Sequence, residues 1–255
     1  TLDKYFLFAK KHHFKCLGIC DYQVMFGFPI FFEKCNALGI KPILGMDVKL
    51  GRFLLSIFIQ NEEGYLNLIK ISNAIQSNTF SYNDITSNQS GLVFVLSVNA
   101  NNISEIKPSI ERLEKDLTNF YVGLEIYSSL DVENIKNNLS DLNVKVIIYP
   151  FIRYLKKEDA IVLDIVDAIR NSATLNYQTK EGVNYLYTNE EIDNIYQGLN
   201  IVSEDDFIKQ FDFNLKSNRG VMLQLFNEID AKTTIKEQCL EGLKRKGKNS
   251  DKYLS

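Results

Sequence analysis

Residues 16–48 read CLGICDYQVMFGFPIFFEKCNALGIKPILGMDV. Two short stretches of it, Cys16–Cys20 and Lys41–Val48, have the length and the nearly continuous hydrophobicity of buried strands. Between them, residues 28–38 have apolar side chains at helical spacing and are followed by Gly39, a residue type common just after helices. The order strand, helix, strand predicts a βαβ unit.

The same alternation continues on both sides of this unit. A helix is expected over Leu2–Lys11, where Thr1 could cap it. Further strands are expected over residues 53–59, 92–98, 121–127 and 144–149, and further helices over residues 62–76, 103–117, 130–142 and 157–171. Strands that alternate with helices in this way predict an α/β fold with parallel strands, either a closed barrel or a doubly wound sheet.

The C-terminal part of the sequence follows a different pattern. From about Asn176 the alternation ends, and residues 184–187 predict a short strand that leads into a helix capped at Thr188. A last helix is expected over residues 231–247, ending in Lys244-Arg245-Lys246. We interpret this basic end as a solvated helix terminus that opposes the helix dipole, with a phosphate contact as the alternative.

Composition and charge limit the class of protein. The 255 residues are 45% hydrophobic and 24% charged, and the net charge is only -3, so the overall basic excess of an autonomous nucleic-acid-binding protein is absent. No apolar run approaches the ~18 to 20 residues that a membrane span needs. The first residues resemble neither a signal peptide nor a transit peptide, so we expect a soluble cytoplasmic protein. The four cysteines form no C-x-x-C pair and are expected to be reduced thiols.

Both fold classes place a functional site at the carboxyl ends of the strands. The residues expected there are Asp21, Asp47, Ser97, Glu125 and the stretch Pro150–Arg153. The only two histidines, His12 and His13, are adjacent, and neighbouring side chains on a helix point about 100° apart. We therefore expect them at the surface of the first helix rather than on one metal ion.

Four segments, in order along the chain, resemble motifs of one protein family. Residues 37–45 (ALGIKPILG) are similar to its A-G-I-K-P-I-x-G segment, and residues 60–71 (QNEEGYLNLIKI) to its N-E-E-G-Y-x-N-L-x-K-L helix. Residues 154–160 (YLKKEDA) resemble its Y-L-x-P-E-D-A turn, and residues 239–244 (CLEGLK) its C-x-E-G-L-K helix. By these motifs the chain resembles the N-terminal PHP (polymerase and histidinol phosphatase) domain of bacterial DNA polymerase III alpha subunits.

The resemblance implies a fold and a division into domains. The family fold is a distorted (β/α)7 barrel, here without the family's first strand, because the H-x-H strand with which active PHP domains begin is absent from this sequence. The PHP domain would cover residues 1–225, with the barrel core at about 1–171, and residues 226–255 would begin the connection to the polymerase palm. A barrel that lacks one strand exposes two strand edges.

The metal-site positions of the family have diverged in this sequence. The family's T-D-H reads Cys20-Asp21-Tyr22, and its G-x-E glutamate is replaced by Asp47. The segment that corresponds to the family's N-D-V-H-Y has Phe151 in place of the aspartate and Arg153 in place of the histidine. Leu163 stands where many members of the family have a further histidine. We interpret Asp21, Tyr22, Asp47, Phe151, Arg153 and Leu163 as vestigial metal-site positions, with no catalytic residue, no metal and no other cofactor. Asp21 is expected to pair with Arg153, and Tyr22 and Phe151 to fill the volume of the lost ligands.

The resemblance also implies a function in bacterial DNA replication. The domain would be non-catalytic, support the rest of the polymerase alpha subunit and present a docking surface to the proofreading exonuclease subunit, with DNA contacted only through the full polymerase. The parent family consists of DNA-directed DNA polymerases, which are nucleotidyltransferases, but the palm would lie beyond Ser255, so no activity is expected from this chain alone. The alternative is a metal-dependent phosphoesterase or secondary 3'-5' proofreading nuclease, which needs histidines at the strand ends. No phosphate-binding loop, nucleophile elbow or dinucleotide fingerprint indicates another class.

Overall fold

The computed structural model describes residues 2–128, 130–172, 183–215 and 231–247. It divides the chain into two compact units, Thr1–Leu215 and Lys216–Ser255. The predicted domain boundary at residues 225 and 226 and the predicted change of pattern at Asn176 both lie outside the described residues. They stay predictions.

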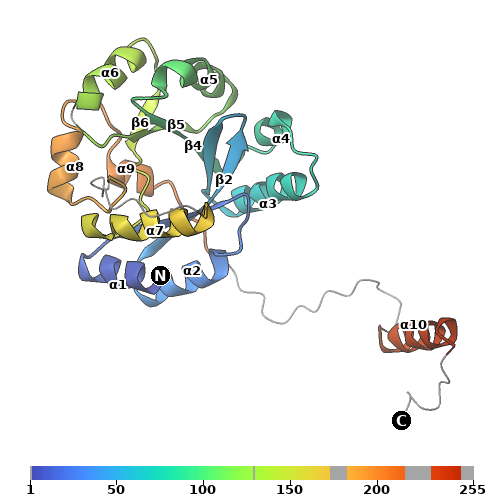
Figure 1. Ribbon diagram of the computed structural model, residues 1–255. Coiled ribbons are helices and arrows are strands. Elements are labelled where there is room, and N and C mark those ends of the chain that lie inside the picture. The colour runs from blue at the N-terminus through green and yellow to red at the C-terminus, as the bar shows by residue number, and fades with distance from the viewer. Residues whose placement is uncertain (1, 129, 173–182, 216–230, 248–255) are drawn as a thin grey trace. The chain divides into compact units, whose positions relative to one another are not determined.

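One six-stranded sheet, with the strand order β1-β2-β3-β4-β5-β6, organises the first unit (Figure 1). The strands are β1 (Cys16–Tyr22), β2 (Lys41–Leu50), β3 (Phe53–Ile59), β4 (Leu92–Asn99), β5 (Phe120–Glu125) and β6 (Lys145–Ile148). In the part of the chain that the structure describes, β1 and β6 do not pair with each other, so the sheet has two edges. The α/β class is confirmed, and six strands agree with a seven-stranded barrel without its first strand.

Helices cover the sheet in the order that the sequence predicts. They are α1 (Leu2–Lys11), α2 (Phe28–Ala37), α3 (Glu62–Gln76), α4 (Tyr82–Ser87), α5 (Ile103–Asp116), α6 (Leu130–Leu139), the 3-10 turn η1 (Lys157–Asp159), α7 (Ala160–Arg170), α8 (Asn189–Ile195) and α9 (Glu204–Ile208), with α10 (Ala231–Arg245) in the second unit. The sequence analysis missed α4 and α9, because six and five residues are too few to show a helical period. Within the described residues, no helix is both long and apolar enough to cross a membrane.

The prediction of parallel strands is wrong at β3. This strand runs antiparallel to both β2 and β4, whereas β1, β2, β4, β5 and β6 pair in parallel wherever they are neighbours. The reason is the two-residue connection Gly51-Arg52 between β2 and β3, since so short a loop can join only antiparallel neighbours. Gly51 has a φ of +59°, a conformation that glycine adopts without a steric penalty.

The sheet is buried on both faces, and each face has its own cluster of apolar side chains. The outer face packs under α2, α3 and α5, and includes Met46, Leu55, Phe94 and Val122. The inner face carries Ile43, Phe58, Val93, Val95, Tyr121 and Ile147, which pack against Phe211 from the C-terminal part of the unit. Because side chains alternate along a strand, the pairing register assigns every residue of the sheet to one of these two faces.

Candidate functional site

Polar side chains follow the apolar cluster along the inner face. Asp47 pairs with Ser56, and Ser56 pairs with Val95 of the inner-face cluster. Ser97 and Glu125 continue the alternation of Val95 and Tyr121 on their strands, and Tyr149 that of Ile147. The structure therefore brings Asp47, Ser97 and Glu125 to one face near the carboxyl ends of the parallel strands, as the sequence analysis expected.

Asp47 is the acceptor at the centre of a first hydrogen-bond network. The Ser56 hydroxyl donates to Asp47 Oδ1 at 2.6 Å, and the Cys20 thiol donates to the same oxygen at 3.0 Å. Tyr149 in turn donates from its hydroxyl to Ser56 Oγ at 2.9 Å. Burial, and then the neighbouring Asp47, raise the pKa of the Cys20 thiol well above its usual value, and burial does the same for the pKa of Tyr149. Both groups stay protonated and act as donors at neutral pH.

Glu125 is the acceptor of a second network. The Ser97 hydroxyl donates to Glu125 Oε1, and the Tyr127 hydroxyl donates to Oε2 at 3.3 Å. Asn184 connects this network to the chain beyond β6, because its side-chain amide donates to the Tyr127 hydroxyl at 3.0 Å and to the Phe151 carbonyl oxygen at 2.8 Å. Burial and the charge of Glu125 raise the pKa of Tyr127. Both carboxylates of the inner face are thus engaged by neutral donors.

Asp21 does not belong to this site. It pairs with Met46, a residue of the outer-face core, whereas Asp47 pairs with Tyr22 across the same two strands. Asp21 and Asp47 therefore lie on opposite faces of the sheet. The Asp21 carboxylate accepts a hydrogen bond from the Gly27 backbone N–H at 3.1 Å, where α2 begins. Its role is to satisfy a free donor at the start of a helix.

The interpretation of Arg153 and the aromatic replacements needs correction. Among the described residues, no ion pair joins Asp21 to Arg153, whose side chain is exposed and whose backbone N–H donates to the Asn184 carbonyl oxygen at 2.8 Å. Tyr22 and Phe151 are 54% and 51% exposed, so they do not fill the volume of lost ligands. Leu163 lies on α7, half-buried. Of these six positions, only Asp47 contributes its side chain to the inner-face networks, whereas Phe151 and Arg153 bond to Asn184 through their backbone.

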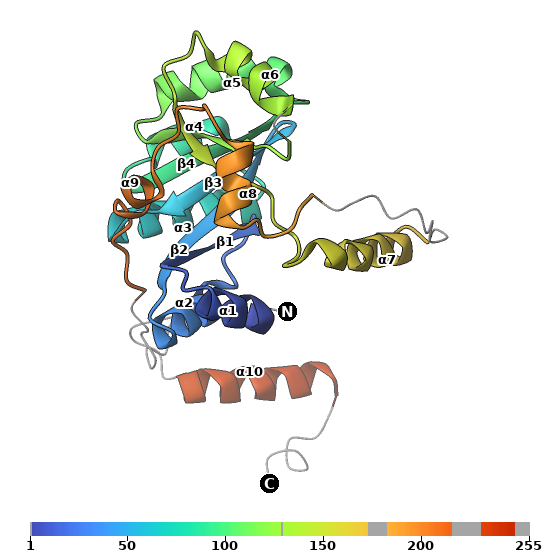
Figure 2. The same ribbon diagram turned by 90° about the vertical axis from the view of Figure 1, so that its left-hand side faces the viewer.

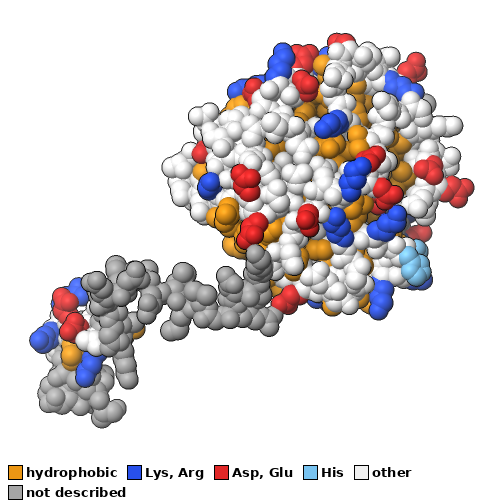
Figure 3. All heavy atoms as spheres, turned by 180° about the vertical axis from the view of Figure 1, so that it is seen from behind, with side chains coloured by type: hydrophobic (Ala, Val, Ile, Leu, Met, Phe, Trp, Pro, Cys, Tyr) orange, Lys and Arg blue, Asp and Glu red, His pale blue; other side chains and the backbone are white. Residues whose placement is uncertain are grey.

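The donor set of the inner face does not fit the metal centre of an active PHP domain. It contributes two carboxylates and no imidazole, and hydroxyl and thiol donors already engage those carboxylates. Within the described ranges, no group of three or more His, Cys, Asp or Glu side chains is placed to hold a metal ion. His12 and His13 are exposed after the end of α1, and Figure 3 shows histidine side chains at the surface of the molecule. His12 stacks on Phe8 with 4.1 Å between ring centroids.

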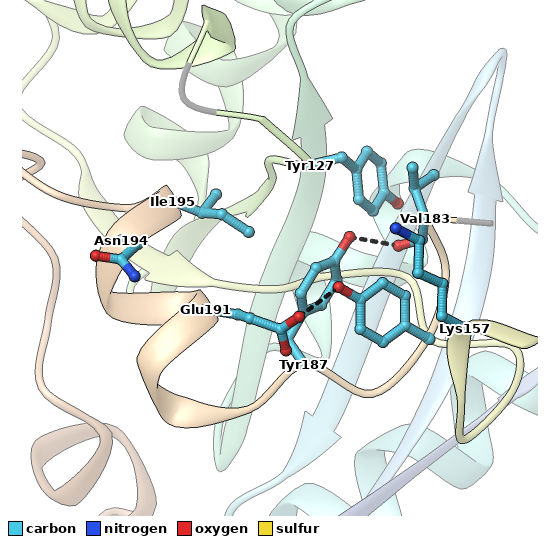
Figure 4. A pocket seen from close by; sticks show the side chains of 8 residues that line it. Tyr127, Lys157, Val183, Tyr187, Glu191, Asn194 and Ile195 are labelled. Carbon is cyan, nitrogen blue, oxygen red and sulfur yellow. Dashed lines mark hydrogen bonds between the residues drawn. The ribbon is translucent and has the colours of Figure 1, made fainter. Parts of the chain in front are cut away.

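A cavity of about 320 Å³ opens beside the second network, and we call it the tyrosine pocket (Figure 4). Its lining comes from the loop after β5, from η1, from the segment that leads into α8 and from α8 itself. It consists of Tyr127, Lys157, Val183, Tyr185, Tyr187, Glu191, Asn194 and Ile195. The sequence analysis treated residues 184–187 as a short strand, but only a single bridge between Tyr154 and Tyr185 forms there. The capped helix after Thr188 is confirmed as α8, with a reciprocal capping box between Thr188 and Glu191.

One pattern in the sequence, which was not interpreted above, indicates two of the aromatic side chains of this pocket. Tyr185 and Tyr187 alternate in a Tyr-x-Tyr pattern, which puts two aromatic rings on one side of an extended segment. Their partner Tyr127 lies 58 positions earlier, and only the fold brings it alongside them.

Comparisons with known proteins agree with the motifs. The family model described as PHP domain matches residues 1–93. DNA polymerase III subunit alpha of Streptococcus pyogenes serotype M3 is 26% identical over 267 residues, which covers 100% of this chain and 24% of that protein. DNA polymerase III subunit alpha of Staphylococcus aureus is 24% identical over 259 residues. This alignment covers 96% of this chain and 23% of the Staphylococcus protein. The chain thus spans about a quarter of the length of these curated relatives.

Similarity to solved structures is weaker. A putative metal-dependent phosphoesterase from Bifidobacterium adolescentis covers 74% of this chain at 10% identity with a TM-score of 0.37, and an amidohydrolase from Chromobacterium violaceum covers 56% at 8% identity with a TM-score of 0.34. The comparison with known proteins therefore rests on sequence similarity and not on the solved structures. Residues 1–93 match the model of the PHP domain, and the chain is similar over its whole length to the N-terminal region of DNA polymerase III alpha subunits.

Proposed function

We propose that this chain is a non-catalytic PHP domain that acts in bacterial DNA replication as part of a DNA polymerase III alpha subunit. In this role it supports the remainder of the polymerase and offers a docking surface to the proofreading exonuclease subunit. It contacts DNA only as part of the larger enzyme. Figure 3 supports the last point for the face that it shows, where acidic and basic side chains are interspersed rather than gathered into a basic patch.

One observation carries the non-catalytic part of the proposal. At Asp47, which stands where the family has a metal-binding glutamate, the carboxylate is engaged by Cys20 and Ser56, and Glu125 on the same face of the sheet is engaged by Ser97 and Tyr127. A hydrolytic centre needs neutral imidazoles and carboxylates whose lone pairs point at the metal, with an open position for water. Here hydrogen-bond donors of the protein itself already engage Asp47 Oδ1 and both carboxylate oxygens of Glu125.

The alternative function, a metal-dependent phosphoesterase or 3'-5' nuclease, makes a different demand on the same residues. A metal ion bound at Asp47 Oδ1 would displace the thiol and hydroxyl donors from that oxygen and would find no histidine to complete its shell. Each displaced donor would then be left without an acceptor in a half-buried site, which costs about 1–3 kcal/mol per group.

Metal content and hydrolysis together test the catalytic question. Purified protein would be analysed for bound metals and incubated with a generic phosphodiester in added Mn²⁺ or Zn²⁺, beside the variants Asp47→Asn and Asp164→Asn. Asp164 is an exposed residue of α7 and serves as the matched control. We expect substoichiometric metal and no hydrolysis above background. Stoichiometric metal with activity that Asp47→Asn abolishes and Asp164→Asn retains would overturn the non-catalytic function.

Binding to the cognate exonuclease subunit tests the docking role separately. Isothermal titration of the full chain with that subunit should give a saturable complex. A chain that is folded by circular dichroism but shows no binding would remove the docking role and leave the supporting role intact.

A further inference from the structure

The outer face of helix α7 is apolar and open to solvent. Its side chains recur at helical spacing, each is at least 39% exposed, and we call them the α7 stripe: Val162, Ile165, Val166 and Ile169. Figure 2 shows α7 standing away from the sheet of its own unit. Apolar side chains at positions i, i+3, i+4 and i+7 form the seam along which two helices pack. A contiguous exposed patch of this kind marks an interaction site.

The polar side of α7 limits what can cover the stripe. Asp164 and Asp167 lie on the side of the helix opposite the stripe, and Arg170 is the one basic residue among its 11 positions. Helices that lie on anionic lipid carry lysine and arginine on their polar side. The acidic side of α7 therefore disfavours a membrane surface and favours an apolar helix of a protein as the partner.

Two opposite charges flank the stripe at its ends. Asp159, the N-cap residue, has helical backbone angles and lies three positions before Val162, while Arg170 lies four positions after Val166. Both therefore lie beside the same edge of the stripe. Arg170 already pairs with Asp167 of its own helix, with 3.6 Å between Nη1 and Oδ1. This pair is exposed, and a guanidinium group has donors for a second carboxylate.

The α7 stripe is complementary to a copy of itself. When a second α7 is laid antiparallel and the pair is centred between Ile165 and Val166, Val162 of each helix lies opposite Ile169 of the other. Ile165 of each helix then lies opposite Val166 of the other. Every apolar side chain of the stripe has an apolar partner in this arrangement, and a two-fold axis relates the two copies.

The same arrangement pairs the charges at the ends of the stripe. The N-terminal end of each helix meets the C-terminal end of the other, so Asp159 of each copy reaches Arg170 of the other copy, which gives two ion pairs. A parallel pair would instead gather two carboxylates at one end and two guanidinium groups at the other. We propose that a second copy of this chain packs on the α7 stripe, with the two α7 helices antiparallel.

The size of this interface sets its strength. One three-turn helix from each copy forms an interface below the ~1,200 Å² at the lower limit of stable complexes, so we expect a weak dimer with a Kd of about 10–100 µM. At about 1 µM the chain is then monomeric, and a substitution in the stripe leaves its free energy of unfolding nearly unchanged.

Sedimentation equilibrium of the full chain tests the proposal. Samples from about 1 to 300 µM are kept in reducing buffer, because Cys239 is exposed and could form a disulfide between copies. Ile169→Glu puts a charge into the seam, and Ile30→Glu is the matched control, since Ile30 is an isoleucine of α2 that is 58% exposed. The average mass should increase toward that of two chains in the original protein and in Ile30→Glu, whereas Ile169→Glu should weaken the dimer at least about tenfold.

Charge variants test the antiparallel orientation. Asp159→Arg and Arg170→Asp each turn both ion pairs into like-charge contacts and should each weaken the dimer about tenfold. Mixed in equal amounts, the two variants form a heterodimer in which arginine again meets aspartate at both ends. Its Kd should return to within about threefold of the original value. Circular dichroism verifies that each variant is folded.

Three outcomes would overturn the proposal. A chain that is monomeric at about 300 µM would leave the stripe to a partner other than a second copy. A dimer that Ile169→Glu leaves intact would be joined through another surface. If Ile169→Glu removed the dimer but the mixture of charge variants stayed monomeric, the antiparallel pairing would be wrong. These outcomes are independent of the metal and exonuclease tests above, since neither test involves association of two copies.

Discussion

Gly64 shows how a single residue of the family motif is required by packing. A Cβ at this position would lie 1.8 Å from the carbonyl oxygen of Gly91, a backbone atom that cannot move aside. The contact is tight because the N-cap Asn61 draws the first turn of α3 inward, its side chain accepting from the Gly64 backbone N–H at 3.0 Å. The Gly91 carbonyl is itself held by the Gln60 backbone N–H at 2.9 Å.

Gly64→Ala should therefore lower the free energy of unfolding by at least about 2 kcal/mol, the range of overpacked sites. The control is Gly18→Ala on β1, where a Cβ would be 3.9 Å from its nearest neighbour, an ordinary contact. Urea denaturation of both variants measures the difference. Equal midpoints for the two variants would show that α3 shifts away from Gly91 at little cost.

Asp47 should be a stabilising residue, because it is the acceptor for the Cys20 thiol and the Ser56 hydroxyl. Asp47→Ala leaves both donors without a partner and should lower the free energy of unfolding by about 1–3 kcal/mol. Asp164→Ala, on the exposed side of α7, should change it by less than about 0.5 kcal/mol. Thermal and urea unfolding would compare the two variants. If Asp47→Ala left the free energy of unfolding unchanged, water would have replaced the carboxylate in the network.

Two thiols, the half-buried Cys16 and the buried Cys35, give the free energy of unfolding a pH dependence. Burial raises the pKa of Cys16 and of Cys35 from 9.0 to about 11. Between these values the unfolded chain has released protons that the folded chain still holds, so folding becomes less favourable as pH increases. The contribution of these two thiols to the free energy of unfolding should be constant below pH 9 and fall between pH 9 and 11. Urea denaturation across this range measures it, and Cys16→Ala/Cys35→Ala should flatten the fall relative to Cys239→Ala.

At the scale of the elements, α7 differs from α2, α3 and α5, which bury side chains against the sheet. None of its side chains is buried, and Val162, Ile165, Val166 and Ile169 form an exposed apolar stripe. Figure 2 shows α7 standing away from the sheet, in contrast to α5, whose Ile103, Ile106 and Ile110 are fully buried. The two helices have similar amphipathic sequences but opposite environments.

Charge substitutions should separate these environments. Ile169→Glu, at a side chain that is 74% exposed, should change the free energy of unfolding by less than about 0.5 kcal/mol. Ile110→Glu buries an unpaired carboxylate under the sheet and should prevent folding. Circular dichroism and thermal melting distinguish the outcomes. A large loss of stability in Ile169→Glu would show that α7 packs against the body of the isolated chain.

At the scale of the whole molecule, the chain is two units, and the first should fold by itself. Phe211 is buried in the inner-face cluster, and the backbone N–H groups of Val202 and Asp212 donate to the Val146 and Gln60 carbonyl oxygens at 2.8 Å each. These contacts tie the stretch up to Leu215 to the sheet. The single described helix of the second unit, α10, has 15 residues, a length at which isolated helices are marginal in water.

Truncation after Leu215 should leave the urea midpoint of the remaining chain unchanged. Truncation after Asn200 removes Phe211 and the two backbone hydrogen bonds, and should lower the free energy of unfolding by several kcal/mol, about 3–5 for the lost phenylalanine alone. A destabilised 1–215 chain would show that the second unit contributes to folding of the first.

The amino-acid sequence alone specified the elements and the kinship. Apolar runs located all six strands, helical spacing located the longer helices, and ordered motifs identified the family, because these signals are local and lie within windows of about 5–15 residues. Even the direction of β3 was present locally, in the two-residue link Gly51-Arg52.

The tertiary structure alone decided which polar residues meet. A shift of one position moves a side chain to the other face of a sheet, so Asp21 accepts a hydrogen bond at the start of α2 while Asp47 joins the inner face, although both lie near the ends of neighbouring strands. Partners such as Tyr149 for Ser56, or Tyr127 for the tyrosine pocket, lie far apart along the chain. Their contact depends on strand register and on the path of the C-terminal segment, which are set by long-range packing and leave no local trace in the sequence.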